Sequence, residues 1–339
     1  MGTDHPADHL RGLFNAWKGQ PPDHISELPG SGSARKYYRL SSPQGETWIG
    51  AFNDDIQENE TFFYLSKHFE SKGLRVPSVL RVSDDRRYYI LTDLGDQTLY
   101  ALLQKQKDQG GDEEAMEPHY LAVLADLIRF QLEGPEGLDP ERLYPVPSFS
   151  KQAVHWDLNY FKYYFLRLAG VPYNESSLQK SLDKLADAIL RQSAGYFMYR
   201  DFQSRNILLH DNTYYYIDYQ GGRFGPLTYD PASLLFNTRA ALSPAFREKL
   251  LGHYIQMLSD RMAIDADRFR QEYYLMALLR VLQAMGAYGY RGYFERKPLF
   301  LSGIPFGQDN LAWLLRHGGL TIEPYLRDLL EDVAGSDAL

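Results

Sequence analysis

The segment that decides the fold is Tyr199-Arg200-Asp201-Phe202-Gln203-Ser204-Arg205-Asn206, and Asp218 follows twelve residues after Asn206. Short runs rich in aromatic and β-branched residues flank it at 196–199, 207–209 and 214–219, and the polar residues 210–213 join the last two. Such runs predict short strands, with residues 210–213 as the turn of a hairpin. A hairpin between Asn206 and Asp218 brings both residues to its base, so the sequence predicts that their side chains face one cleft.

These residue types suit phosphoryl transfer. The reaction needs a carboxylate that orients and deprotonates the acceptor hydroxyl, together with oxygen ligands for Mg²⁺, which binds few protein carboxylates and completes its shell with phosphate and water. Asp201 is therefore the candidate base, and Asn206 and Asp218 are the candidate metal ligands. The alternative for each residue taken alone is a structural turn, in which an Asp or Asn side chain caps the local backbone.

The same segment resembles the catalytic loop of the aminoglycoside phosphotransferase and choline kinase superfamily, and residues 217–222 resemble its metal-binding segment. More narrowly, the sequence resembles the bacterial N-acetylmuramate/N-acetylglucosamine anomeric kinases, and this likeness continues through 225–230 and 297–305. The resemblance implies the bilobal protein-kinase-like fold, with ATP and Mg²⁺ as cofactors. It also implies that Asp201 and Arg205 are catalytic and that Asp230 is a buried acid supporting the loop.

The pattern along the chain agrees with an α+β fold, a small antiparallel sheet lobe at 1–93 and a larger, mainly helical lobe at 94–339. The first hundred residues alternate strand-like runs with Gly, Pro and Asp turns, and a single helix at 57–69 interrupts them. From His119 onward apolar residues recur at helical spacing. The polar stretch 105–118 lacks that period and predicts a surface loop.

A phosphate-binding loop is predicted at Gly30-Ser31-Gly32-Ser33, with Arg35 and Lys36 beside it. Backbone N–H groups and cations in such a loop suit the phosphates of a nucleotide. A plain hairpin turn is the alternative, because Arg35 stands where the third glycine of a Gly-x-Gly-x-x-Gly motif would lie.

Protein kinases place a lysine on the third strand, where it contacts the phosphates and a helix glutamate. The corresponding strand here, 48–52, contains no lysine, and we predict that Phe52 occupies that position. The following helix still offers Glu58 and Glu60, whose alternative role is to stabilise the helix N-terminus. The ATP-binding contacts are therefore expected to be rearranged, weakened or lost.

Two further segments are candidate binding sites. Thr92, Asp93 and Leu94 lie where the hinge backbone of the superfamily meets adenine, which makes them candidate nucleotide contacts. The aromatic and polar block 156–165 offers Trp156, Asp157 and Asn159 for a sugar, because rings pack on sugar C–H faces while carboxylates and amides bind hydroxyls. An amphipathic core helix is the alternative for this block.

Composition excludes several classes of protein. The 339 residues carry a net charge of −8 with 44% hydrophobic residues, which argues for a folded protein without a broad surface for nucleic acid or anionic membrane. The absence of cysteine excludes disulfides, thiol nucleophiles and Cys-type zinc sites. No apolar run reaches a transmembrane length and the N-terminus lacks a secretory signal pattern, so a cytoplasmic location is expected. The oligomeric state stays open.

The function predicted from these observations is an ATP-dependent small-molecule kinase that transfers the γ-phosphoryl group to a hydroxyl. The resemblance implies an amino sugar of the N-acetylmuramate or N-acetylglucosamine type, phosphorylated at the anomeric position. Choline, ethanolamine and aminoglycosides are the alternative acceptors. A nucleotide-binding pseudokinase is the alternative of another class, favoured by the missing strand lysine and opposed by the presence of Asp201, Asn206 and Asp218 together.

Overall fold

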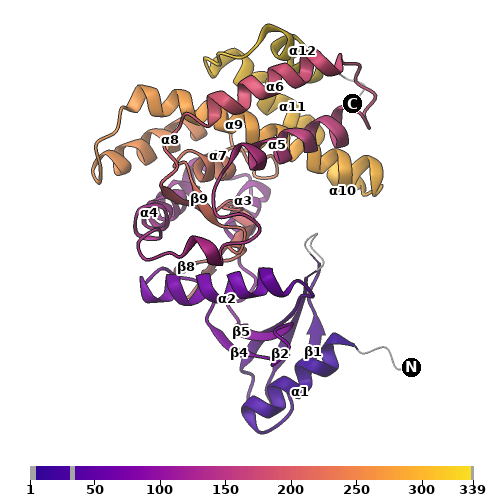
Figure 1. Ribbon diagram of the computed structural model, residues 1–339. Coiled ribbons are helices and arrows are strands. Elements are labelled where there is room, and N and C mark those ends of the chain that lie inside the picture. The colour runs from indigo at the N-terminus through magenta and orange to yellow at the C-terminus, as the bar shows by residue number, and fades with distance from the viewer. Residues whose placement is uncertain (1–4, 31–34, 337–339) are drawn as a thin grey trace.

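The computed structural model describes residues 5–30 and 35–336, which form two lobes (Figure 1). The smaller lobe holds the predicted antiparallel sheet, and its five strands lie in the order β1-β2-β3-β5-β4. Its strands are β1 (His24–Glu27), β2 (Lys36–Ser41), β3 (Thr47–Phe52), β4 (Val79–Val82) and β5 (Tyr88–Thr92). The predicted α+β architecture, with a small sheet lobe, agrees with these strands.

Helix α2 (Ile56–Ser71) joins the sheet to the larger lobe. Its apolar side chains, including Phe62, Leu65 and Phe69, are buried in the main core, and the Phe62 ring lies 5.5 Å from the ring of Tyr89 on β5. On its other side, Ser66 is hydrogen-bonded to the hydroxyl of Tyr219 in the larger lobe at 2.6 Å. The predicted helix is confirmed, and it fixes the sheet relative to the candidate catalytic segment.

The prediction that a single helix interrupts the first hundred residues is wrong. Helix α1 (Pro6–Lys18) covers the opposite face of the sheet, where Leu10 and Phe14 are buried. Proline at its first turn and Gly19 at its C-cap, with φ +78°, are ordinary helix boundary signals. The side chain of Leu10 fills the space above Gly50 on β3, where an added Cβ would lie 3.0 Å from it.

The larger lobe is mainly helical, as predicted. Its α-helices are α3 (Leu99–Asp108), α4 (Glu117–Glu133), α5 (Lys151–Tyr160), α6 (Glu175–Ile189), α7 (Tyr229–Leu235), α8 (Pro244–Ser259), α9 (Ala266–Tyr288), α10 (Pro298–Leu301), α11 (Ile304–His317) and α12 (Pro324–Ala334). Short 3₁₀ turns lie at Glu113–Met116, Pro140–Arg142 and Ser204–Asn206, and π-helical turns at Phe161–Leu166 and Gly289–Phe294.

The stretch 105–118 is not a continuous loop. Helix α3 extends to Asp108, a 3₁₀ turn occupies Glu113–Met116, and α4 begins at Glu117. Tertiary contact accounts for the longer helix, since the Lys107 amine donates to the backbone carbonyls of Ala240 and Ala241 at 2.7 and 2.9 Å. A basic residue in the last turn also suits the helix dipole.

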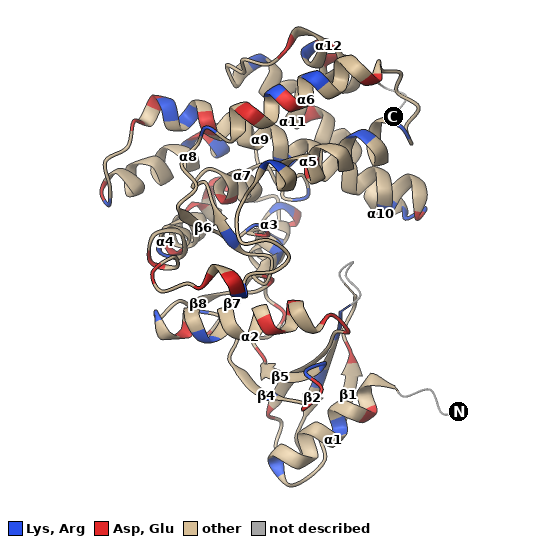
Figure 2. Ribbon diagram, in the orientation of Figure 1, with Lys and Arg blue, Asp and Glu red and all other residues tan. Residues whose placement is uncertain are grey.

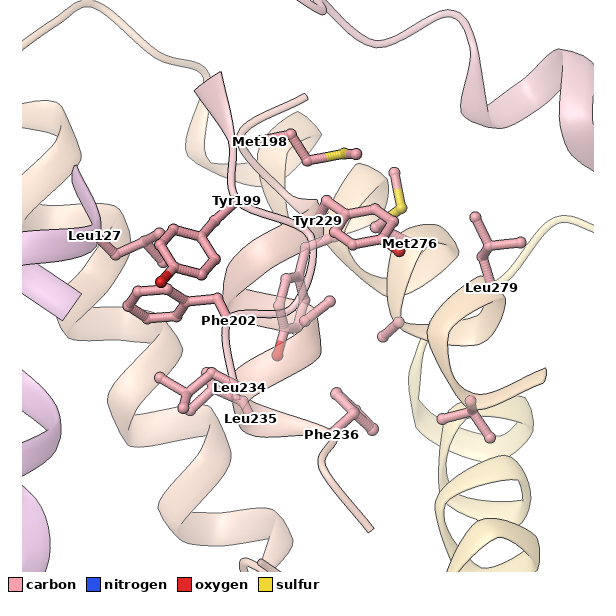
Figure 3. Packing of buried hydrophobic residues seen from close by; sticks show 14 of the residues in the cluster. Leu127, Met198, Tyr199, Phe202, Tyr229, Leu234, Leu235, Phe236, Met276 and Leu279 are labelled. Atoms are coloured by element: carbon pink, nitrogen blue, oxygen red, sulfur yellow. The ribbon is translucent and has the colours of Figure 1, made fainter. Parts of the chain in front are cut away.

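Two small sheets lie within the helical lobe. Strands β7 (Ile207–His210) and β8 (Thr213–Tyr216) form the predicted hairpin, and β6 (Tyr196–Met198) pairs with β9 (Arg223–Gly225). Between β6 and β7 the chain is anchored by Tyr199 and Phe202, whose rings lie 5.2 Å apart (Figure 3). Both are buried, so the intervening Asp201 has firm packing on either side.

Charged residues of both signs are interspersed along the two lobes (Figure 2). No helix within the described residues is long and apolar enough to span a bilayer. The sheet of the small lobe ends at Thr92 and α3 starts at Leu99, and the lobe boundary between residues 93 and 94 stays a prediction.

Candidate active site

Asp230, near the start of α7, holds the backbone ahead of Asp201. Its two carboxylate oxygens accept hydrogen bonds from the backbone N–H groups of Tyr199 and Arg200, both at 2.8 Å. Burial raises the pKa of Asp230 to about 7, although these two N–H donors act in the opposite direction. Arg200 itself adopts a positive φ of 77°, a strained backbone that Asp230 stabilises by binding both adjacent N–H groups.

Asn206 and Asp218 meet at the base of the β7–β8 hairpin, where the sequence places them. The Asn206 Nδ2 group donates to the backbone carbonyl of Asp201 at 2.8 Å and to the Asp218 carboxylate at 3.1 Å. The Ile217 N–H also donates to the Asn206 carbonyl at 3.0 Å. Because Nδ2 makes both of these bonds, the amide is held in one orientation and its Oδ1 remains available as a ligand.

The Asp218 carboxylate is held by amides, and no cation among the described residues is hydrogen-bonded to it. Gln220 donates to its Oδ1 at 2.8 Å, and Asn206 donates to its Oδ2. Burial raises the pKa of Asp218, and the nearby negative charge of Asp201 raises it further. Two neighbouring carboxylates in a partly desolvated site are stabilised by a cation.

The site fits a magnesium ion that takes some of its ligands from the protein and others from a nucleotide. Asp218 and the Oδ1 of Asn206 supply two oxygens, and Mg²⁺ ordinarily takes the remaining positions from phosphate and water. In residues 5–30 and 35–336 there is no group of three or more His, Asp or Glu side chains that could hold a metal without such help. These two roles stay predictions, as do those of Asp201 and Arg205.

A cavity of about 400 Å³ opens beside Asp201, Asn206 and Asp218. Its wall combines the catalytic segment, including Arg205, with side chains of α7, α9 and the residues that follow α7. Tyr160 belongs to the predicted block 156–165, whereas sequence reasoning missed the lining residues from later segments, chiefly Arg239, Arg280, Gln283, Tyr288 and Arg291. Arg280 had a visible signal, because it interrupts the apolar run 273–282 of α9.

The three predicted acceptor residues lie on α5, and none of them is among the residues that line this cavity. Trp156 is 44% exposed, and Tyr160, one turn later, is the residue of α5 that lines the cavity wall. Burial raises the pKa of Asp157, while the neighbouring guanidinium groups of Arg280 and Arg200 oppose that rise. Asp157 therefore lies in the same charged environment as the catalytic segment, and Asn159 is half-buried on the same helix.

On the nucleotide side, Arg35 pairs with Glu58. Its guanidinium Nη2 lies 3.0 Å from Glu58 Oε2, and Nη1 donates to the hydroxyl of Tyr37 at 3.4 Å. Arg35 is only 6% exposed and lies near enough to Asp218 to oppose the rise in that residue's pKa. Lys36 is exposed at the start of β2, Gly30 precedes it, and residues 31–34 lie outside the described part of the chain.

The prediction that Phe52 takes the place of the strand lysine is wrong. The Phe52 ring stacks on Tyr88 at 4.9 Å and packs near Leu10, on the sheet face covered by α1. Side chains alternate between the two faces of a strand, and Ala51 is the residue that enters the core containing Phe62 of α2. Ala51 thus occupies the lysine's side of the sheet, and Arg35 from the neighbouring strand brings a cation to Glu58.

The hinge residues are held by an arginine from β2. Arg39 Nε donates to Asp93 at 2.6 Å, and Arg39 Nη1 and Nη2 each donate to Asp96 at 2.8 Å. Thr92 Oγ1 accepts from the Ser78 N–H at 3.0 Å, and Leu94 is buried. These contacts order the segment between the lobes, and adenine binding by Thr92, Asp93 and Leu94 stays a prediction.

Comparison with known proteins places this chain among phosphotransferases. The family model described as "Phosphotransferase enzyme family" matches residues 24–268. An N-acetylmuramate/N-acetylglucosamine kinase of Pseudomonas putida is 23% identical over 308 residues, covering 88% of this chain and 86% of that protein. The kinase of the same name from Neisseria meningitidis is 27% identical over 207 residues, covering 59% of this chain and 58% of its own length.

Solved structures show the same fold at low sequence identity. A Plasmodium vivax ethanolamine kinase aligns with a TM-score of 0.61 at 12% identity, covering 86% of this chain and 82% of that one. An amicoumacin kinase in complex with AMP-PNP, Ca²⁺ and its ligand aligns with a TM-score of 0.59 at 12% identity, covering 92% and 88%. At these identities the likeness concerns the fold.

Proposed function

Since this chain belongs to the phosphotransferase enzyme family and is a small-molecule kinase with a hydroxyl acceptor, we propose that it phosphorylates an amino sugar from ATP, at the anomeric hydroxyl. The observation that carries the proposal is the meeting of Asp201, Asn206 and Asp218 at the mouth of one cavity. A cytoplasmic location, and a small-molecule partner with no nucleic acid or membrane partner, stay predictions.

In the proposed reaction, the acceptor hydroxyl oxygen forms a bond to the γ-phosphorus of ATP. The bond from that phosphorus to the β–γ bridging oxygen breaks, and ADP leaves with the electron pair. The Asp201 carboxylate orients the hydroxyl and takes its proton. Asn206 and Asp218 hold Mg²⁺, which neutralises phosphate charge when bound. Arg205, at the cavity wall near Asp218, adds a positive charge beside the transferring group.

We propose that Arg35 binds the phosphates of ATP. It is buried near Asp218, and its Nε atom has no hydrogen-bond partner among the described residues. Glu58 fixes one side of the guanidinium and leaves that donor for an acceptor oxygen. The backbone of Gly30 to Ser33 and the exposed Lys36 complete the proposed phosphate contacts.

The amino-sugar acceptor rests on three relatives that bear the name N-acetylmuramate/N-acetylglucosamine kinase. Trp156, Asp157 and Asn159 are proposed to contact the sugar from α5, where an aromatic face adjoins hydrogen-bonding groups. The charge of the cavity disfavours choline and aminoglycosides, because Arg205, Arg239, Arg280 and Arg291 line it and would repel a cationic acceptor.

A pseudokinase is the less favoured function. The absence of a lysine from β3 supports a pseudokinase. However, Arg35 pairs with Glu58, and we propose that it replaces the missing lysine. The test is release of ADP from Mg-ATP with N-acetylglucosamine, N-acetylmuramate, choline or kanamycin. Stimulation by either sugar supports the proposal. Stimulation by choline or kanamycin alone, or by no acceptor, contradicts it.

A further inference from the structure

The cavity beside Asp201 contains more positive charge than phosphoryl transfer accounts for. Arg205, Arg239 and Arg280 all line it, and within residues 5–30 and 35–336 none of the three forms an ion pair with a carboxylate. The two acids in the wall, Asp201 and Asp218, are assigned to the acceptor hydroxyl and the metal. A cationic wall of this kind is stabilised by an anion from outside the chain.

Arg280 shows this most clearly. It lies on α9 and is only 7% exposed, and its Nη1 donates to two neutral acceptors, the Tyr229 hydroxyl at 2.7 Å and the Gln283 side-chain carbonyl at 3.1 Å. Its Nε is buried and has no hydrogen-bond partner in the described part of the chain. Burying a charged donor without a partner is costly, and a bound anion would remove that cost.

Arg239 approaches the same region from the segment after α7. Its guanidinium lies over the Phe300 ring, 5.1 Å from the centroid. Tyr288, which is hydrogen-bonded to Thr238, lines the same cavity as the three arginines. Burial raises the pKa of Tyr288, and the charges of Arg239, Arg205 and Arg280 oppose this rise. The three guanidinium groups therefore converge around one aromatic side chain.

The three arginines divide between the two substrates. Arg205 stands next to Asn206 in the segment that begins with the proposed base, and we assign it to the phosphate side. Burial lowers the pKa of Arg280, and the negative charges of Asp157 and Asp201, on the acceptor side, oppose this effect. Arg239 belongs to the segment between α7 and α8, in the larger lobe.

From this convergence, and resting on the proposed kinase activity, we infer that Arg239 and Arg280 form a subsite for a negatively charged substituent of the acceptor. A carboxylate is the substituent that fits best, because a guanidinium offers it paired N–H donors. A phosphate monoester shares this chemistry and is distinguished below. The subsite selects acidic over neutral sugars and is separate from the groups that carry out transfer.

The test compares N-acetylmuramate with N-acetylglucosamine, two acceptors that differ by an ether-linked carboxylate. In Arg239→Gln, kcat/KM for N-acetylmuramate is expected to fall by about 10- to 100-fold, the loss of one charge-assisted contact, while kcat/KM for N-acetylglucosamine and the KM for ATP stay unchanged. Arg239→Lys should restore part of the loss. Arg191→Gln, at an exposed position outside the cavity, is the matched control.

Each outcome decides the inference. An equal loss with both sugars, or a raised KM for ATP in Arg239→Gln, overturns it. N-acetylglucosamine 6-phosphate used more efficiently than N-acetylmuramate, with the same sensitivity to Arg239, supports the anion subsite and assigns it to phosphate. If neither sugar is phosphorylated, the proposed function fails. Calorimetric binding of N-acetylmuramate, weakened in Arg239→Gln but not in Arg191→Gln, then still supports the subsite, and unchanged binding overturns it.

Discussion

The guanidinium of Arg35 lies 3.0 Å from the carboxylate of Glu58, joining the start of β2 to the first turn of α2. Protein kinases make the corresponding lysine–glutamate pair from the third strand. Here β3 presents Ala51 on that face, and the β2–β3 register pairs it with Tyr37, two residues beyond Arg35. A cation thus reaches Glu58 of α2 from the residue just before β2, and its equivalence to the kinase pair stays a proposal.

Arg35→Gln should raise the KM for ATP by about 10- to 100-fold, because one charge-assisted phosphate contact is lost. Lys36→Gln removes the exposed neighbouring cation, a second proposed phosphate contact, and should have the smaller effect. Initial rates at varied ATP and saturating acceptor measure both. An unchanged KM in the Arg35 variant would exclude it from the phosphate site.

Asp218→Ala should abolish the Mg²⁺-dependent part of nucleotide binding, since it removes a carboxylate assigned to the metal. Asp211→Ala is a suitable control, because its side chain is 92% exposed in the turn of the same hairpin. Calorimetry with ATP, with and without Mg²⁺, provides the comparison. Mg²⁺-dependent binding that persists in Asp218→Ala would refute the assignment.

Asp201→Asn should retain Mg-ATP binding and lower kcat by ~10²–10⁴, the usual contribution of a general base. The hydrogen bond that the Asp201 backbone carbonyl accepts from Asn206 does not involve the substituted side chain, so the loop should keep its shape. Binding and turnover are measured on the same preparation. A kcat near that of the wild type would remove Asp201 from the proton transfer.

The raised pKa of Asp230 predicts that the stability of the protein depends on pH. Its pKa rises from 3.8 to about 7 on folding, so the folded state holds a proton that the unfolded state has released. Stability from this group is greatest at low pH and is lost as pH rises through about 7. The free energy of unfolding relative to Asp230→Asn should decrease by about 1 kcal/mol between about pH 6 and about pH 8.

Urea denaturation of both proteins at the two pH values checks this expectation. The difference between them, rather than either value alone, isolates Asp230 from other titrating groups. A difference that stays constant, or one that grows with pH, would mean that the buried carboxylate keeps an ordinary pKa.

Local spacing made the catalytic segment predictable. Asn206 and Asp218 flank a hairpin whose strands and turn are legible in the sequence, so their meeting follows from short-range structure. Phe52 was misplaced because side chains alternate along a strand, and an error of one residue moves a side chain to the opposite face of the sheet. Neighbouring sequence alone does not tell which of Ala51 and Phe52 faces α2.

Arg239 and Arg280 could not be found in this way, because they reach the cavity from segments that only the folded chain brings together. Arg280, a charged residue within the apolar face of α9, was a signal in the sequence. The surface that Arg280 faces is formed only when distant segments fold together. Helix α1 was missed for a different reason. Its boundary residues, Pro6 and Gly19, were present, yet its apolar side is narrow and is completed by packing on the sheet.

The measurement that tests the central claim most directly is ³¹P NMR of the reaction of the wild-type protein with Mg-ATP and N-acetylglucosamine or N-acetylmuramate. The account predicts a new sugar phosphate signal, coupled to the anomeric proton, that grows as the γ-phosphate signal of ATP declines. Phosphate transferred to another hydroxyl would contradict the anomeric assignment, and ATP left unchanged with both sugars would contradict the proposed function itself.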